Sequence, residues 1–168
     1  MEPTVVDNRD RFKAVPAPAI LERVLPKLDG SSLAGIRKII LLDEDPHKKR
    51  SKSPVTARYN SLGNTRRGDV YLFFSHFEEL EDELSDNEMY LTYLVARSLA
   101  HELYHHSVRS QRIRRRPKKQ IEERDAQKHA QSVATHITHA LYPKPQYQEL
   151  WASMKETLER RNGEAVST

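Results

Sequence analysis

Two histidines four residues apart, His101 and His105, constrain this chain more than any other feature of its sequence. On an α-helix, four residues advance the chain slightly more than one turn, so both imidazoles lie on one side and can reach a single Zn²⁺. Glu102 follows the first histidine and is placed to take a proton from a metal-activated water. The pentad His101-Glu102-Leu103-Tyr104-His105 therefore predicts two zinc ligands and a general base.

The residues around the pentad predict one helix from about residue 86 to about residue 108. On a helical wheel, an apolar side lies next to the side with the histidines. The apolar side consists of Val95, Leu99 and Leu103. The start of the helix carries a capping box, in which Ser85 bonds the amide of Glu88 and Glu88 reaches back. A helix buried along one edge, with ligands emerging beside that edge, suits a metal site.

Two histidines leave a catalytic zinc one protein ligand short. Cysteine cannot be that ligand, because the chain contains none. A second helix, which Pro117 can begin, offers carboxylates. Its apolar stripe consists of Ala126, Ala130, Val133, Ile137, Ala140 and Leu141. Extended backwards, this stripe reaches Glu122 and Glu123 equally, and Asp125 and His129 are further candidates.

The pentad, followed by Glu123-x-x-Ala126 and Ala130, resembles the gluzincins, zinc metallopeptidases whose third ligand is a glutamate on a following helix. It is most similar to the compact intracellular ImmA/IrrE-like group, whose second helix reads Glu-x-Glu/Asp-Ala-x-x-Phe-Ala. The chain departs from that pattern at His129, where an aromatic apolar residue is usual, and at Gln127, where related enzymes often have Asp.

The resemblance covers residues 98–130 and implies that Glu123 completes the zinc site. It further implies a zinc metallopeptidase with one Zn²⁺ per chain. By analogy, this would be an intracellular regulatory protease with a protein or peptide substrate, such as a DNA-binding regulator.

The rest of the chain predicts an α+β domain of the compact zincin type, with a small three-stranded sheet, an active-site helix and a second ligand-bearing helix. We expect a flexible N-terminal arm at residues 1–18, a single domain at 19–161 and a frayed tail at 162–168. The predicted strands are 36–42, 55–59 and 69–74, and the additional helices are 19–28, 75–84 and one after Pro145. By the zincin analogy, strand 69–74 borders the site and could pair with an extended substrate.

The connection between the two metal helices is strongly basic, although the net charge of the chain is only +4. Its positive residues are Arg109, Arg112, Arg114, Arg115, Arg116, Lys118 and Lys119. This connector is either a solvated link or an electropositive rim that steers an acidic peptide or nucleic acid. Aromatic residues that would stack on bases are absent from it.

Two further expectations concern the setting of the protein. The lack of cysteine fits a reducing compartment, and the sequence shows neither a leader nor an apolar run long enough to span a membrane, so we expect a soluble, cytoplasmic protein. Alternatives to a peptidase are a nucleic-acid-binding module or a peptide-binding module on a zincin scaffold without turnover.

Several side chains have roles that the sequence leaves open. A donor for the developing oxyanion is needed, and the candidates are Tyr59, Tyr71, His76 and Tyr104. His106 turns about 100° away from His105 on the helix, so we expect it on the solvated side. His136 and His139 fall off the apolar stripe of the second helix and should be exposed.

Overall fold

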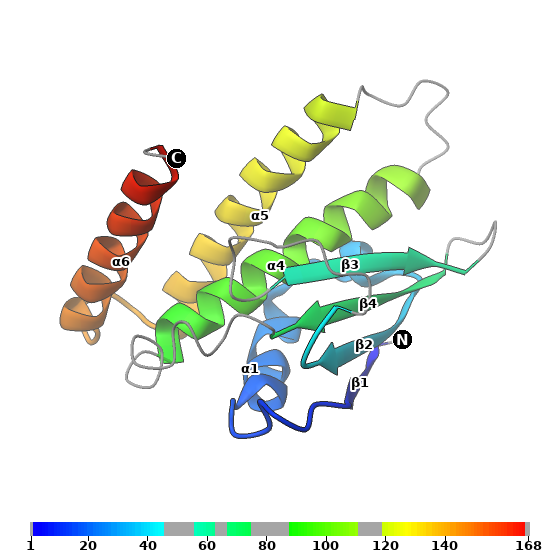
Figure 1. Ribbon diagram of the computed structural model, residues 1–168, viewed down its shortest axis with the longest axis horizontal. Coiled ribbons are helices and arrows are strands. Elements are labelled where there is room, and N and C mark those ends of the chain that lie inside the picture. The colour runs from blue at the N-terminus through cyan, green and yellow to red at the C-terminus, as the bar shows by residue number, and fades with distance from the viewer. Residues whose placement is uncertain (1, 46–55, 63–66, 75–87, 111–118, 167–168) are drawn as a thin grey trace.

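Helix α4 (Glu88–Ser110) lies at the centre of the structure, against the sheet on one side and helix α5 (Lys119–Leu141) on another (Figure 1). The chain is described here from a computed structural model at residues 2–45, 56–62, 67–74, 88–110 and 119–166. Within these residues, five α-helices and a four-stranded mixed sheet make an α+β fold.

The sheet has the strand order β1-β2-β4-β3. Strands β1 (Thr4–Asp7), β2 (Ile36–Leu42) and β4 (Gly68–Phe73) are parallel, and β3 (Thr56–Ser61) pairs antiparallel with β4. The inner strands β2 and β4 are rich in β-branched and apolar residues, which suit a sheet covered by helices. Strand β3 is the polar outer strand, and it lies against α4.

Two sequence expectations about this sheet were wrong. It has four strands instead of three, because β1 adds to the outer side of β2. The predicted strand 69–74 corresponds to β4, which lies between β2 and β3 and is not available to an extended peptide. The outer strand that lies against α4 is β3.

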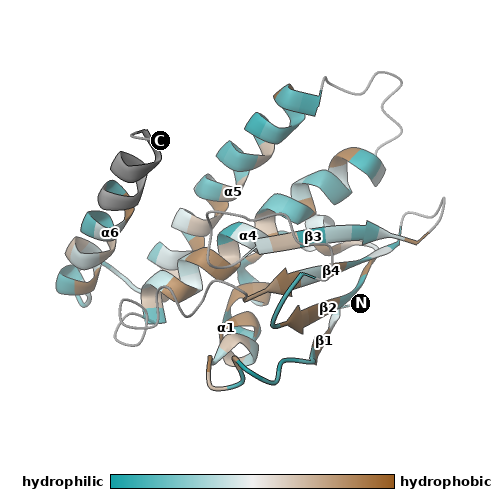
Figure 2. Cartoon of the chain, in the orientation of Figure 1, coloured by the Kyte–Doolittle hydropathy of each residue, from teal (hydrophilic) through white to brown (hydrophobic). Residues whose placement is uncertain are grey.

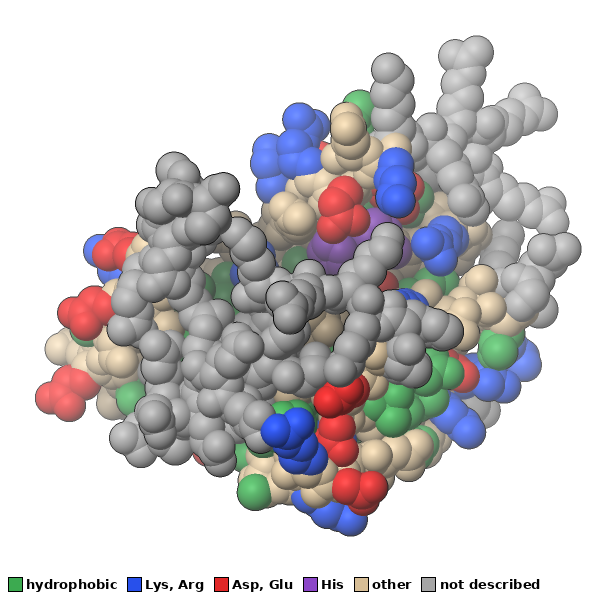
Figure 3. Space-filling view, in the orientation of Figure 1, with side chains coloured by type: hydrophobic (Ala, Val, Ile, Leu, Met, Phe, Trp, Pro, Cys, Tyr) green, Lys and Arg blue, Asp and Glu red, His purple; other side chains and the backbone are tan. Residues whose placement is uncertain are grey.

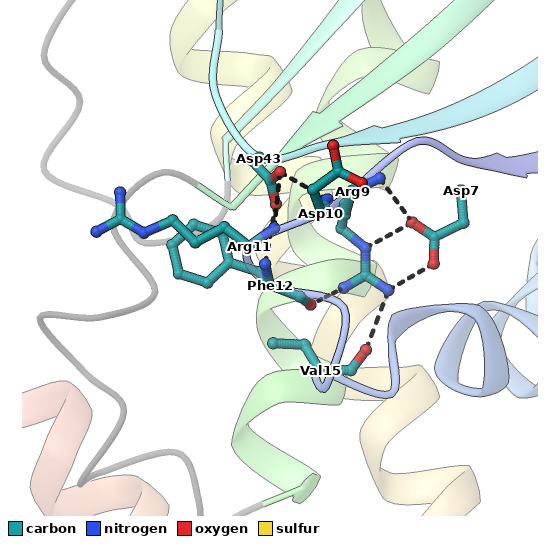
Figure 4. Close-up of polar contacts among 7 residues, drawn as sticks. All are labelled: Asp7, Arg9, Asp10, Arg11, Phe12, Val15 and Asp43. Carbon is teal, nitrogen blue, oxygen red and sulfur yellow. Dashed lines mark hydrogen bonds and ion pairs between the residues drawn. The ribbon is translucent and has the colours of Figure 1, made fainter.

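The N-terminal segment, expected to be a loose arm, is instead fixed to the domain by a buried arginine (Figure 4). The guanidinium of Arg9 donates from Nε and Nη2 to the two carboxylate oxygens of Asp7, at 2.8 Å each. It also donates to the carbonyl oxygens of Phe12 and Val15, at 2.9 and 3.1 Å, and lies over the ring of Phe74. All of its donors point into the protein, so this segment is part of the domain.

Asp43, which follows β2, holds the same segment from the other side (Figure 4). Its carboxylate accepts hydrogen bonds from the backbone amides of Asp10, Arg11 and Phe12 at 2.8 to 3.1 Å. Strand β1 has only four residues and is flanked by a proline and polar residues, so its hydrophobic pattern is too short to predict a strand from sequence. These long-range contacts are what make it a strand.

Three short helical segments connect β1 to β2 and complete the core. They are α1 (Ala17–Val24), the 3₁₀ turn η1 (Leu25–Lys27) and α2 (Gly30–Leu33), in place of the one predicted helix. Pro26 explains the break, because a proline removes a helical hydrogen bond. The first half of α4, from Met89 to Ala96, is buried on all sides. Figure 2 shows this apolar part of α4 beside the apolar strands.

Helix α5 follows the predicted stripe in part. Ala126, Ala130 and Ile137 are buried, but Ala140 is exposed, and Ala134 and Thr138 are buried instead. The buried row Ala126, Ala130, Ala134 and Thr138 follows steps of four along the contact with α4, whereas the predicted stripe alternated steps of four and three.

The last helix, α6 (Gln148–Val166), runs through most of the predicted frayed tail. The predicted helix 75–84, Ser85 of the capping box and residues 111–118 of the basic connector lie outside the described residues. No helix in the described part of the chain is long and apolar enough to cross a membrane.

Candidate metal centre

Helices α4 and α5 bring the three expected ligands together. The Nε2 atoms of His101 and His105 are 3.2 Å apart. Glu123 places one carboxylate oxygen 3.2 Å from His101 Nε2 and the other 3.4 Å from His105 Nε2. Within the described residues, His101, His105 and Glu123 are the cluster of His, Asp or Glu side chains that could hold a metal ion.

The spacing of these atoms fits a zinc ion. Ligand atoms at the usual Zn–N and Zn–O distances of about 2.0 to 2.1 Å, in tetrahedral geometry, lie about 3.3 to 3.4 Å from one another. The 3.2 Å between the two Nε2 atoms is close to that value, and with one ligand atom taken from each residue all three lie within 4.8 Å of one another. Two imidazoles and one carboxylate are also a donor set typical of catalytic zinc, which keeps a further position open.

Glu122, the other glutamate on the extended stripe, lies on the opposite side of the same imidazole. Its Oε1 accepts a hydrogen bond from Nδ1 of His105 at 2.8 Å. Because a carboxylate only accepts, Nδ1 is the nitrogen that donates to Glu122, and Nε2 is the nitrogen that faces Glu123. A carboxylate behind a ligand histidine fixes the ring and makes it a better donor to a metal. Adjacent glutamates thus have different geometric roles.

The electrostatic setting favours a neutral His101. Burial lowers the pKa of this imidazole, and the nearby His105 and Arg97 lower it further, while Glu123 acts in the opposite direction. Because a metal binds only the unprotonated nitrogen, a lowered pKa leaves more of the ligand in its binding form near neutral pH.

Glu102 points from α4 to strand β3. The backbone amide of Tyr59 donates a hydrogen bond to Glu102 Oε2, with an N···O distance of 2.6 Å. Burial raises the pKa of Glu102 to about 7, although the Tyr59 amide and His105 favour the charged form. A carboxyl that titrates near neutral pH can both accept and deliver a proton, as a general base must.

The ring of Tyr59 is held in place on three sides. It contacts the imidazole of His106, with ring centroids 4.8 Å apart, and Arg109 lies over its face at 5.7 Å. Its third contact is Gly68 on β4: a β-carbon there would come within 2.2 Å of the Tyr59 ring. The backbone of the same residue pairs with Val70 on β4, which places the amide that bonds Glu102.

The expectation that His106 is solvated was wrong. It is 2 % exposed, and its Nε2 lies 2.8 Å from the carbonyl oxygen of Ala34, to which it can donate. The wheel argument failed because α4 has neighbours on more than two sides, so the side 100° from His105 packs against α2 and β3. His136 and His139 are exposed as predicted, and His139 stacks on Trp151.

The remaining sequence candidates lie around this site in different ways. Tyr104 projects toward α5, where its ring contacts His129. The ring of Tyr59 packs inward, and Tyr71 stacks on Phe73. His76 and the basic residues Arg112, Arg114, Arg115 and Arg116 lie outside the described residues.

Figure 3 shows histidine side chains at the surface, close to both acidic and basic side chains. Glu123 is the most accessible of the ligands, with 47 % of its side chain exposed, against 21 % for His101 and 15 % for His105. All three ligand side chains are therefore partly accessible from solvent.

Sequence reasoning missed the role of Glu122, which it weighed only as a ligand, and the contribution of the Tyr59 amide. No pattern could have revealed the second, because a backbone donor has no sequence signature. Comparison with known proteins finds no family model, no curated protein and no solved structure that matches this chain.

Proposed function

We propose that this protein is a zinc-dependent metallopeptidase of the gluzincin type, in which His101, His105 and Glu123 hold one Zn²⁺. The observation that carries the proposal is the convergence of His101, His105 and Glu123 from two helices. One ligand atom of each lies within 4.8 Å of the others, and a half-buried glutamate is one residue from the first ligand.

A bound Zn²⁺ supplies Lewis acidity, which makes water easier to deprotonate and polarises a carbonyl group. The residues of the chain then have distinct tasks. Glu102 takes the proton from the attacking water and delivers it to the leaving amine. The Tyr59 amide keeps the carboxylate of Glu102 in one orientation, and Glu122 keeps His105 in one tautomer.

The setting of the activity is part of the same proposal. The resemblance to ImmA/IrrE-like proteins suggests a regulatory protease in the cytoplasm, with a DNA-binding regulator as one class of substrate. The absence of cysteine is compatible with a reducing compartment.

The first experiment is elemental analysis of the purified protein. We expect about one Zn²⁺ per chain, and loss of stoichiometric zinc in His101→Ala and His105→Ala. His136→Ala is the matched control, because this exposed histidine on α5 should not affect zinc content. Full zinc in either ligand variant would refute the site.

The second experiment tests turnover on an unfolded protein such as denatured casein. Glu102→Gln should keep zinc and lose hydrolysis by about 10² to 10⁴-fold, because the amide has the same shape but cannot accept a proton. Cleavage by this variant at the wild-type rate would exclude Glu102 as the base. An intact zinc site with no cleavage in the wild type would favour a peptide-binding module instead.

A further inference from the structure

Helix α4 carries two arginines at equal distances from the metal ligands. Arg97, His101, His105 and Arg109 follow one another at steps of four, so they form a slowly turning row along the helix. Both arginines are exposed. At a rise of 1.5 Å per residue, each lies about 9 Å along the axis from the midpoint of the two histidines, and about 18 Å separates them.

The two neighbours of α4 determine the direction in which a bound chain can run. Helix α5 lies beside the row through the contacts of Glu123, and strand β3 lies beside it through the bond from Tyr59 to Glu102. A peptide whose backbone reaches the ligands must enter and leave between these two elements. This strip of α4 carries the two histidines, with Arg97 toward its amino end and Arg109 toward its carboxyl end, about 120° apart around the helix axis.

Among the described residues along this strip, the acidic side chains have polar partners, whereas the two arginines form no ion pair. The acidic groups are engaged: Glu122 bonds His105, Glu123 faces both histidines, and the Glu102 carboxylate bonds the amide of Tyr59. In the described part of the chain, neither arginine of the row forms an ion pair, and Arg109 contacts the Tyr59 ring through its guanidinium. The strip therefore has positive charge at both ends.

We propose that the site takes extended peptides with acidic side chains on both sides of the bond to be cut, and that Arg97 and Arg109 each bind the acidic group on one side. This inference rests on the proposed peptidase function and adds its substrate class. An extended chain rises about 3.3 Å per residue, so about 9 Å corresponds to roughly three residues on each side. Arginine suits this task because its fork binds carboxylates in a bidentate manner.

The test uses fluorescent peptides with one common neutral centre. Their flanks carry Glu on both sides, on the amino side only, on the carboxyl side only, or Gln on both sides. Binding is measured by anisotropy on zinc-loaded Glu102→Gln protein, which needs no turnover, and cleavage is measured on zinc-loaded wild type. Zinc content is determined for every variant.

We expect the doubly acidic peptide to bind tightest at low ionic strength. In the Glu102→Gln background, Arg97→Gln should weaken the affinity for peptides with Glu on one flank by about two- to fivefold and leave the effect of Glu on the other flank unchanged. Arg109→Gln should do the same for the other side. Lys128→Gln, an equal charge change at an exposed position on α5, should leave all four affinities unchanged. A general loss of structure would instead weaken the binding of all four peptides, whichever flank carries Glu.

The outcomes distinguish this inference from the function on which it rests. Chelator-sensitive cleavage with equal affinity for acidic and neutral peptides would overturn the acidic preference and leave the peptidase standing. Flank-specific binding without any cleavage would support the two arginines and overturn the peptidase. Arginine variants that behave like Lys128→Gln, or acidic peptides that do not bind, would refute the inference.

Discussion

Glu122 and Glu123 are adjacent in sequence, yet they lie on opposite sides of the imidazole of His105. Glu122 accepts a hydrogen bond from Nδ1 at 2.8 Å, while Glu123 has an oxygen 3.4 Å from Nε2. Successive residues on a helix differ by about 100°, so one imidazole inserted between them can meet both. Glu123 is thus a candidate ligand, and Glu122 is the group that orients the ligand histidine His105.

This geometry predicts unequal costs for removing the two glutamates. Glu123→Ala should lose the stoichiometric zinc, because a ligand is gone. Glu122→Ala should keep the site but weaken zinc binding by about 10- to 100-fold, which is typical of losing a carboxylate behind a ligand histidine. Zinc affinity measured by competition with a chelator decides this. Gln120→Ala, at an exposed position on α5, is the control. A larger loss from Glu122→Ala would reverse the assignment.

The pKa of Glu102 predicts how the metal-free protein responds to pH. Burial raises this pKa to about 7 from an ordinary value of 4.5. A carboxyl with a raised folded-state pKa stabilises the protein below its unfolded pKa and loses that contribution as pH rises through about 7. Glu102→Gln should therefore stabilise the metal-free protein by about 1 to 3 kcal/mol at pH 8 and have little effect at pH 4.

Urea denaturation of the two metal-free proteins across this pH range measures the effect. Carboxyl NMR titration should show one glutamate titrating near neutral pH that the Gln variant lacks. Added Zn²⁺ should lower that pKa, since a nearby cation favours the carboxylate. A stability difference that does not change between pH 4 and pH 8 would contradict the buried setting of Glu102.

The pairing of Arg9 with Asp7 predicts a second, opposite pH dependence. The hydrogen bonds from Arg9 lower the pKa of Asp7 below its ordinary value of 3.8, although burial acts against them. A lowered pKa contributes stability above the unfolded value, and that contribution is lost as pH falls through the folded value. Asp7→Asn should cost about 2 to 3 kcal/mol at pH 7, because it leaves a fully buried guanidinium without its charge partner.

Urea denaturation should show this cost shrinking below pH 3.8. Asp10→Asn is the matched control, since Asp10 is exposed and takes part through its backbone amide. Equal stability of the two variants at pH 7 would mean that the Arg9–Asp7 pair does not help to hold this segment to the domain.

The contact of Gly68 with Tyr59 predicts a steric effect on the site. A β-carbon at position 68 would come within 2.2 Å of the Tyr59 ring, so Gly68→Ala must displace that ring. We expect a loss of about 1 to 3 kcal/mol, as for overpacking in other cores. Because the Tyr59 amide bonds Glu102, peptide hydrolysis should fall as well, with zinc content retained.

Gly30→Ala is the control for this substitution, because a β-carbon at position 30 would meet nothing within 4 Å. Denaturation and turnover are measured on both variants. Equal stability of the two proteins would mean that the Tyr59 ring moves aside without cost and does not hold the amide in place.

The sequence by itself determined the elements with a strong local pattern. The spacing of His101 and His105 and the apolar side of Val95, Leu99 and Leu103 predicted α4, and these three apolar side chains are buried. The β-branched run of β2 was predicted with its observed ends. Such patterns are readable because a single element needs the same periodicity in any fold that buries it.

Only the tertiary structure decided what depends on distant neighbours. Strand β1 exists because β2 offers it an edge, and Arg9 is buried because Asp7 and two carbonyls satisfy it. Periodicity placed Glu122 and Glu123 equally near the core. The packing of α5 on α4 gives them different positions around one imidazole. The rotation of α5 about its own axis is fixed by its contacts with α4, and the sequence of one helix alone does not specify those contacts.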